Sequence, residues 1–229
     1  LSALRKYIEV LETKMCAGDW DSINFERVPS KASLNYRKAF GRHDQERYAA
    51  YLKAVEKGEA KINAGAVYPY EVFRSIVNTR PSAQEILQAD LQWKAMPNWL
   101  EGNEHHGLVI ADTSGSMSGM PILVSVSLAM YFAERNVGPF KDVWMNFSTS
   151  PTFQKLRGNN IHEKYMNMDK HNWSGSTNLQ AAFELILSTA RANKIVQKDM
   201  PTVLYIVSDM EFNDAGSLTN YDAIRQKYA

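Results

Sequence analysis

The sequence predicts an α/β protein in which a helical region precedes a doubly wound, mostly parallel sheet. Residues 1–103 place apolar side chains at three- and four-residue spacing and show no convincing strand. Residues 104–229 alternate short β-branched runs with helical stretches, the pattern of a parallel sheet covered by helices. A polar linker, residues 101–104, joins the two parts. We therefore predict an all-α domain over residues 1–103 and an α/β domain over residues 104–229.

The helical region is expected to contain five helices. The first has an apolar face made by Leu4, Tyr7, Ile8, Leu11 and Met15. Gly18 ends it, and we expect its Cys16 to be buried as a small apolar residue. The other helices are predicted over residues 33–40, 47–57, 70–79 and 82–95. Pro69 and Pro81 precede the last two, at positions typical of a helix start.

The second region alternates strands and helices. Strands are predicted over residues 107–111, 142–147, 152–156 and 202–208, and helices over residues 121–136, 161–168 and 179–193. The second and third strands should pair as a hairpin, because only a short turn separates them. The chain begins at Leu1 and stops at Ala229 inside a helix-like stretch. We therefore expect a fragment whose sheet lacks its C-terminal edge.

Composition sets the outer bounds of function. Lys plus Arg number 26 and Asp plus Glu number 25, so the net charge of +1 does not demand a nucleic-acid partner. The single cysteine excludes an internal disulfide and fits a reducing compartment. The sequence has no signal peptide and no apolar run of about 18 residues, the length that a membrane span needs. We expect a soluble cytoplasmic protein.

Oxygen-bearing side chains follow two predicted strands. Asp112, Ser114 and Ser116 come directly after the first strand, and Asp209 follows the last. Thr177 lies in the loop before the last predicted helix. Open α/β sheets bind ligands at the carboxyl ends of their strands, and hard oxygen ligands suit magnesium. The sequence therefore predicts a metal site that holds Mg²⁺, with Mn²⁺ or Ca²⁺ as alternatives.

The pattern Asp112-x-Ser114-x-Ser116, then Thr177 and Asp209, resembles the metal-ion-dependent adhesion site of the von Willebrand factor A domain. The resemblance implies a Rossmann-like sheet with a short antiparallel edge strand. It also implies that the three hydroxyls bind magnesium directly, while the two aspartates act mostly through water. The metal would then take a sixth oxygen from an Asp or Glu of a partner protein.

Enzymatic readings of the same loop fit less well. Gly115 and Gly119 have the spacing of a hydrolase nucleophile elbow, but Met117 stands at the nucleophile position. Ser114 stands where haloacid-dehalogenase-type phosphatases usually carry a second aspartate. The sequence also lacks the G-x-x-x-x-G-K-[ST] phosphate loop. We expect an interaction module without enzymatic activity, and keep a metal-dependent enzyme as the weaker alternative.

The helical region has its own resemblance. Residues 27–31, 36–40 and 61–65, with the Tyr-Pro-Tyr at 68–70, resemble the domain of unknown function 2828 family. Members of that family join a helical region to a von Willebrand A-like domain. The same architecture is found, more distantly, in the Ro ribonucleoprotein autoantigen.

The comparison with Ro raises RNA binding as the alternative function. Candidate contacts are Arg37, Lys38, Arg42 and Arg47, which lie close to Tyr36 and Phe40. Basic residues beside aromatic ones can grip phosphates and stack on bases. The competing interpretation is an ordinary solvated helix face with core aromatics. The two functions differ in which substitutions should abolish binding: those at Asp112 or Ser114, or those at Lys38 and Arg42.

Overall fold

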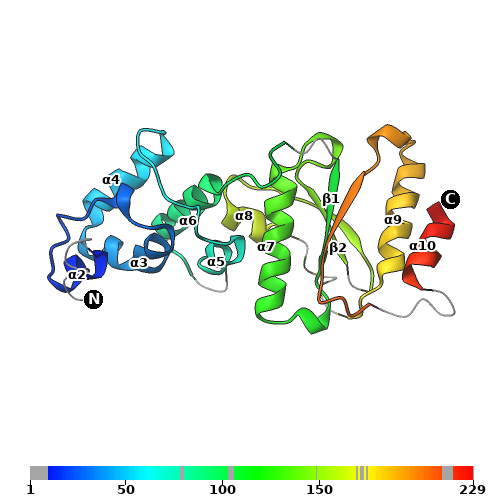
Figure 1. Ribbon diagram of the computed structural model, residues 1–229, viewed down its shortest axis with the longest axis horizontal. Coiled ribbons are helices and arrows are strands. Elements are labelled where there is room, and N and C mark those ends of the chain that lie inside the picture. The colour runs from blue at the N-terminus through cyan, green and yellow to red at the C-terminus, as the bar shows by residue number, and fades with distance from the viewer. Residues whose placement is uncertain are drawn as a thin grey trace. The chain divides into compact units, whose positions relative to one another are not determined.

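A computed structural model describes residues 10–77, 80–102, 106–147, 149–168, 170, 173, 175–212 and 219–228 (Figure 1). The chain divides into two compact units. Leu1–Pro97 with Asn160–His162 form the first, which we call the helical unit, and Asn98–Asn159 with Glu163–Ala229 form the second, the sheet unit. Helices are followed by a four-stranded mixed sheet, which confirms the predicted α/β class at this level.

The helical unit contains α2 (Leu11–Cys16), η1 (Phe25–Arg27), α3 (Ser30–His43), α4 (Gln45–Glu56), α5 (Pro69–Arg74) and α6 (Ala83–Ala95). Its core gathers Ile23, Phe25, Val28, Phe40, Tyr48, Leu52, Ile62 and Leu91. The first predicted helix is described only from α2 onward, and its residues before Val10 lie outside the described chain. Helix α2 buries none of its residues and Cys16 is exposed, so the prediction that Cys16 is buried was wrong.

Two helices differ in length from their predictions. Helix α3 continues past Phe40 to His43. A Cβ at Gly41 would lie 2.9 Å from the Gln84 side-chain oxygen, so glycine at this position lets the Gln84 side chain of α6 approach α3 closely. Helix α5 ends at Arg74, where the Ser75 hydroxyl donates to the Val72 carbonyl (2.7 Å). This local bond competes with a further helical turn.

The sheet unit contains the remaining helices and strands, except that the first two residues of the helix Ile161–Met166 are grouped with the helical unit. In chain order they are β1 (Gly107–Asp112), η2 (Gly115–Met117), α7 (Met120–Arg135), η3 (Gly138–Phe140), β2 (Val143–Phe147), β3 (Thr152–Lys155), α8 (Ile161–Met166), α9 (Leu179–Ala192), η4 (Gln197–Asp199), β4 (Val203–Val207) and α10 (Asn220–Tyr228). The strand order is β3-β2-β1-β4. Strand β1 runs parallel to β2 and β4, while β2 and β3 form the predicted antiparallel hairpin.

Helices cover both faces of this sheet. Figure 1 shows the strands between α7 on one side and α9 with α10 on the other. Leu108 and Ile110 of β1 join Ala182 and Ile186 of α9 in one apolar cluster. Strand β1 is buried along its whole length, as expected of a central strand. None of the described helices combines the length and hydrophobicity that a membrane crossing would require.

The strand register decides where the polar loops lie. Asp112 of β1 pairs with Phe147 of β2, and Ala111 pairs with Val207 of β4. Since these three strands are parallel, their carboxyl ends meet at one edge of the sheet. The loops after β1 and β4 therefore begin side by side, and together with Asp112 at the end of β1 they carry four of the five predicted metal ligands.

The position of Ile110 predicts a large loss of stability on truncation. Ile110 is fully buried under α9, so Ile110→Ala should lower the free energy of unfolding by about 2–5 kcal/mol. Val196→Ala is the control, because Val196 is half exposed and its truncation should change stability by no more than about 0.5 kcal/mol. Urea unfolding followed by circular dichroism measures both. Equal effects would contradict the assignment of β1 to the core.

Candidate metal site

The carboxylate of Asp112 connects two of the predicted loops. Asp112 is the last residue of β1 and is fully buried. One of its oxygens accepts from the backbone N–H of Ser114 (2.9 Å), and the other accepts from the Ser208 hydroxyl (2.6 Å). The first hydrogen bond stabilises a turn directly after β1, and the second connects that turn to Ser208, the residue after β4. A single side chain thus sets the geometry of both loops.

The hydroxyls of Ser114 and Ser116 lie together on the loop after β1. Their oxygens are 3.1 Å apart. Neighbouring oxygens of a magnesium octahedron are separated by about 2.9 Å, because each lies roughly 2.0–2.1 Å from the metal. Ser114 is buried, whereas Ser116 is exposed to solvent. The pair therefore has the spacing that two adjacent magnesium ligands need.

Thr177 belongs to a loop that is fastened to the first one. The Gly115 N–H donates to the Gly175 carbonyl (3.1 Å), and the Ser176 N–H donates to the Thr149 hydroxyl (3.0 Å). Thr177 follows directly and is only 4% exposed. The next residue, Asn178, begins α9 by accepting the Ala181 N–H (3.0 Å). These bonds fix the backbone on both sides of Thr177.

Asp209 completes the set from the loop after β4. It is exposed, and it accepts the Glu211 N–H (3.1 Å) as well as a hydrogen bond from the Ser116 hydroxyl. The Glu211 amide, followed by the Ser116 hydroxyl, lowers the pKa of Asp209 below its usual value. Asp209 is therefore ionised throughout the neutral range.

The donor set as a whole fits a small hard cation. Hydrogen bonds connect Asp112, Ser114, Ser116 and Asp209, and Thr177 lies on the loop bonded to Gly115. Within the described part of the chain, no Lys or Arg forms an ion pair with either aspartate. A buried carboxylate costs free energy unless donors or a cation compensate it. Three hydroxyls and two carboxylates match the oxygen chemistry of Mg²⁺.

The prediction from sequence missed two residues that shape this site. Ser208 donates to the Asp112 carboxylate, and Thr149 holds the loop of Thr177 through the Ser176 amide. Ser208 had a signal in the sequence, since it stands between a predicted strand and Asp209. Thr149 had none, because its role depends on a contact 27 residues away in the sequence.

Comparison with known proteins identifies the family. The model described as "Domain of unknown function (DUF7788)" matches residues 106–229. The chain belongs to the DUF7788 family. A second model, "Domain of unknown function (DUF2828)", matches residues 1–103, which confirms the resemblance predicted for the helical region. Neither description names a ligand, so the metal and RNA assignments stay predictions.

A viral relative matches along most of the chain. "Uncharacterized protein L728" of Acanthamoeba polyphaga mimivirus is 30% identical over 228 residues, which cover 93% of this chain. The chain spans only 39% of the length of that relative. No solved structure matches. The DUF7788 match and the sheet unit both contain all five candidate metal ligands.

The candidate RNA contacts fall into two groups in the helical unit. Arg37 donates to the carbonyls of Leu34 (2.6 Å) and Ser75 (3.1 Å), and only 13% of its side chain is exposed. Arg47 likewise holds nearby carbonyls and the Asp44 carboxylate. Lys38 and Arg42 are exposed. The two arginines of the first group therefore act within the fold.

The aromatic residues of that segment also act within the fold. Phe40 is buried in the core, and the Tyr36 hydroxyl donates to Glu12 (2.9 Å). Neither ring is arranged as an open platform for a base. RNA binding through this segment stays a prediction, and the geometry adds no support to it.

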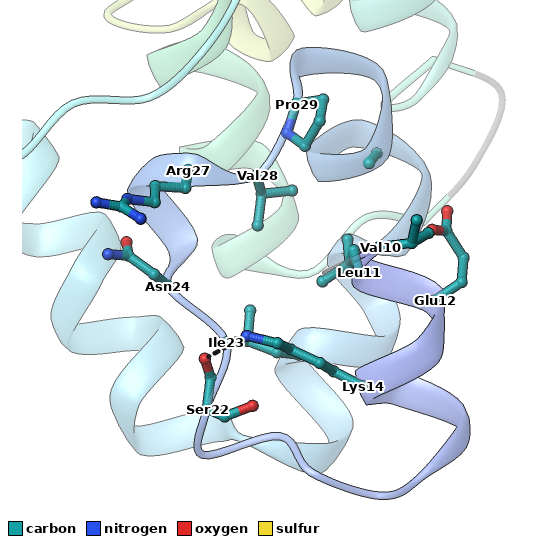
Figure 2. A pocket seen from close by; sticks show the side chains of 11 residues that line it. Val10, Leu11, Glu12, Lys14, Ser22, Ile23, Asn24, Arg27, Val28 and Pro29 are labelled. Carbon is teal, nitrogen blue, oxygen red and sulfur yellow. Dashed lines mark hydrogen bonds between the residues drawn. The ribbon is translucent and has the colours of Figure 1, made fainter. Parts of the chain in front are cut away.

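Figure 2 shows a pocket in the helical unit, beside α2, with a volume of about 550 Å³. Polar and apolar residues line it, and the Lys14 ammonium donates to the Ser22 carbonyl (3.3 Å). Val10, one of the lining residues, begins the described chain. We therefore assign no ligand to this pocket.

The conformation of Gly175 predicts that adding a methyl group at this position, as in Gly175→Ala, lowers the stability of the chain. Gly175 has φ +85°, and a Cβ there would overlap the Thr149 hydroxyl. Gly175→Ala should lower the free energy of unfolding by about 1–2 kcal/mol, the cost of a left-handed non-glycine residue. Chemical denaturation measures this loss. Gly65→Ala serves as the control, because a Cβ at Gly65 meets nothing within 4 Å, and equal losses would refute the proposed constraint.

Proposed function

We propose that this chain is a magnesium-dependent protein-interaction module with a von Willebrand A-like, Rossmann-like sheet. The metal ligands are Asp112, Ser114, Ser116, Thr177 and Asp209. The observation that carries the proposal is the buried Asp112 carboxylate, which fastens two ligand-bearing loops together and has no basic partner in the described chain. A bound divalent cation would compensate that charge.

The topology supports this finer assignment of the fold. The parallel strands β2, β1 and β4 end at one edge, and β3 adds a short antiparallel strand. Helices lie on both faces (Figure 1). The candidate ligands gather where doubly wound sheets place their ligands, outside the carboxyl ends of the strands.

The division of roles among the residues follows from their contacts. The Ser116 hydroxyl donates a hydrogen bond to Asp209, which leaves the lone pairs of the serine oxygen available to a metal. Asp112 uses both oxygens to hold Ser114 and Ser208 in place. Magnesium held mainly by neutral hydroxyls would supply an electrophilic centre that accepts a carboxylate oxygen from outside.

The surroundings of the site support binding to a protein. Met210, which directly follows Asp209, is 68% exposed, and Met120 on the neighbouring helix α7 is 43% exposed. Flexible, polarisable methionine side chains adapt to varied partner surfaces. The described residues of the loops after β1 and β4 include no histidine, lysine or cysteine. Such a set suits holding an ion and an acidic partner group better than transferring a proton.

Calorimetric titration tests the metal site. Mg²⁺ and Mn²⁺ should bind the wild type with one site per chain, and Ser114→Ala or Asp112→Asn should weaken binding at least about tenfold, the loss typical of a disrupted ligand shell. Ser188→Ala is the matched control, because the hydroxyl of this exposed serine donates to the Leu185 carbonyl of its own helix, α9. Equal affinity of the wild type and Ser114→Ala for Mg²⁺ would contradict the assignment.

A capture experiment tests the partner. The immobilised chain should retain a protein from a cell extract in Mg²⁺ and release it when EDTA removes the metal. Asp112→Asn should retain nothing under either condition, and Ser188→Ala should behave as the wild type. Substituting the acidic residues of the captured protein one at a time should identify the carboxylate that reaches the metal. Retention that persists unchanged in EDTA would show that the interaction does not pass through this site.

A further inference from the structure

The loop after β4 carries an exposed carboxylate directly beside the candidate metal site. Glu211 stands two residues after Asp209 and is exposed. Among the residues that the structure describes, no Lys or Arg forms an ion pair with it. Two residues of chain span at most about 7 Å, so the backbones of Glu211 and Asp209 lie within that distance of each other. An acidic side chain therefore stands at the rim of the candidate site.

Hydrogen bonds and packing hold this part of the loop in place. The Met210 N–H donates to the Ser208 hydroxyl (3.0 Å), and the Phe212 N–H donates to the Met210 carbonyl (3.0 Å). The centroid of the Phe212 ring lies 5.9 Å from that of Phe147, within the apolar cluster under α9. Glu211 thus lies between two anchored residues. Its carboxylate is presented to solvent from a fixed backbone, which lowers the entropy lost when a partner binds.

Met210 has a backbone conformation that residues with a side chain normally avoid. Its φ is +68°, in the left-handed region, where a Cβ comes too close to the following carbonyl oxygen. Its side chain is 68% exposed, so little burial within the chain offsets this strain. Strained residues of this kind cluster at binding sites, where the strain serves the shape of the site. The conformation of the loop is therefore consistent with a surface that contacts a partner.

The charges around the site favour a partner that brings a positive charge as well as a carboxylate. The described loops after β1 and β4, with Asp112 included, carry three carboxylates and no basic residue. A bound Mg²⁺ leaves one of these negative charges uncompensated. Lys170, in the loop before α9, lies over the Tyr165 ring instead, 3.5 Å from its centroid. Complementary charges select a partner at an interface, whereas like charges exclude it.

We propose that the site selects partners in which the metal-binding Asp or Glu is accompanied by a Lys or Arg side chain that pairs with Glu211. The inference rests on the proposed function, because the carboxylate on the metal places the basic side chain. In an extended segment, residues i and i+2 point to the same side about 7 Å apart, which matches the spacing of Asp209 and Glu211. An Asp-x-Lys or Asp-x-Arg segment is the simplest ligand of this kind. Charges at this separation lie within the Debye length of about 8 Å at physiological salt, so they still attract each other.

Three short peptides test this selection on the full chain, which is kept in excess over Mn²⁺ so that the metal is bound. They are acetyl-Gly-Asp-Gly-Lys-Gly-amide and the same peptide with Gln or Glu in place of Lys. Paramagnetic broadening of the aspartate proton signals by the bound Mn²⁺ measures the affinity of each peptide. The wild type should bind the lysine peptide about twofold to fivefold more tightly than the glutamine peptide, as an exposed ion pair allows, and the glutamate peptide most weakly. This preference should shrink in about 0.5 M NaCl, because salt screens exposed charges.

Substitutions at Glu211 separate partner selection from metal binding. Glu211→Gln should bind the lysine and glutamine peptides equally, and calorimetry should show that it still binds one Mn²⁺ per chain. Glu211→Lys should prefer the glutamate peptide, because the charge at the rim is reversed. Glu59→Lys is the matched control, since Glu59 is an exposed acid of the helical unit and its reversal changes the net charge equally. This control should keep the peptide order of the wild type.

The outcomes distinguish this inference from the proposed function. If the wild type binds Mn²⁺ and all three peptides with equal affinity, partner selection by Glu211 is overturned and the proposed function stands. If Mn²⁺ does not bind, or binds without broadening any peptide signal, both are overturned. If Glu211→Gln abolishes Mn²⁺ binding, Glu211 is a metal ligand and its assignment to the partner is wrong. If Glu59→Lys changes the peptide order as Glu211→Lys does, the preference reflects the net charge of the chain and the pairing with Glu211 is overturned.

Discussion

The buried carboxylate of Asp112 is the constraint on which the rest of the candidate site depends. It ends the central strand at full burial, and its two oxygens hold the turn at Ser114 and the end of β4 at Ser208. The Gly115–Gly175 hydrogen bond then brings the Thr177 loop to the same edge. Replacing water around a carboxylate with only two hydrogen bonds is unfavourable unless a cation shares its charge. The geometry of the loops and the case for a metal thus have the same physical origin.

Short sequence patterns were sufficient to predict most of the helices and strands. The β-branched run before Asp112, Pro69 at the start of α5 and Pro81 ahead of α6 each predicted an element from a few residues. Two predictions differ from the structure. Helix α3 runs to His43 where the sequence predicted an end at Phe40, and Cys16 is exposed because α2 buries no residue. Which loops meet could be predicted from strand order, whereas the bonds through Ser208 and Thr149 could not.

The helical unit shows why basic residues in a sequence are weak evidence for a nucleic-acid surface. The guanidinium groups of Arg37 and Arg47 donate hydrogen bonds to backbone carbonyls of their own unit, and Phe40 belongs to the core.

The most direct test of the central claim is a crystal structure of the chain with Mn²⁺, read by the anomalous scattering of the metal. The account predicts a single strong anomalous peak within bonding distance of the Ser114 and Ser116 hydroxyls, with Thr177 as the third protein ligand and the carboxylates of Asp112 and Asp209 one water away. A peak bound elsewhere, or loops that keep the same conformation with no metal between them at saturating Mn²⁺, would contradict it.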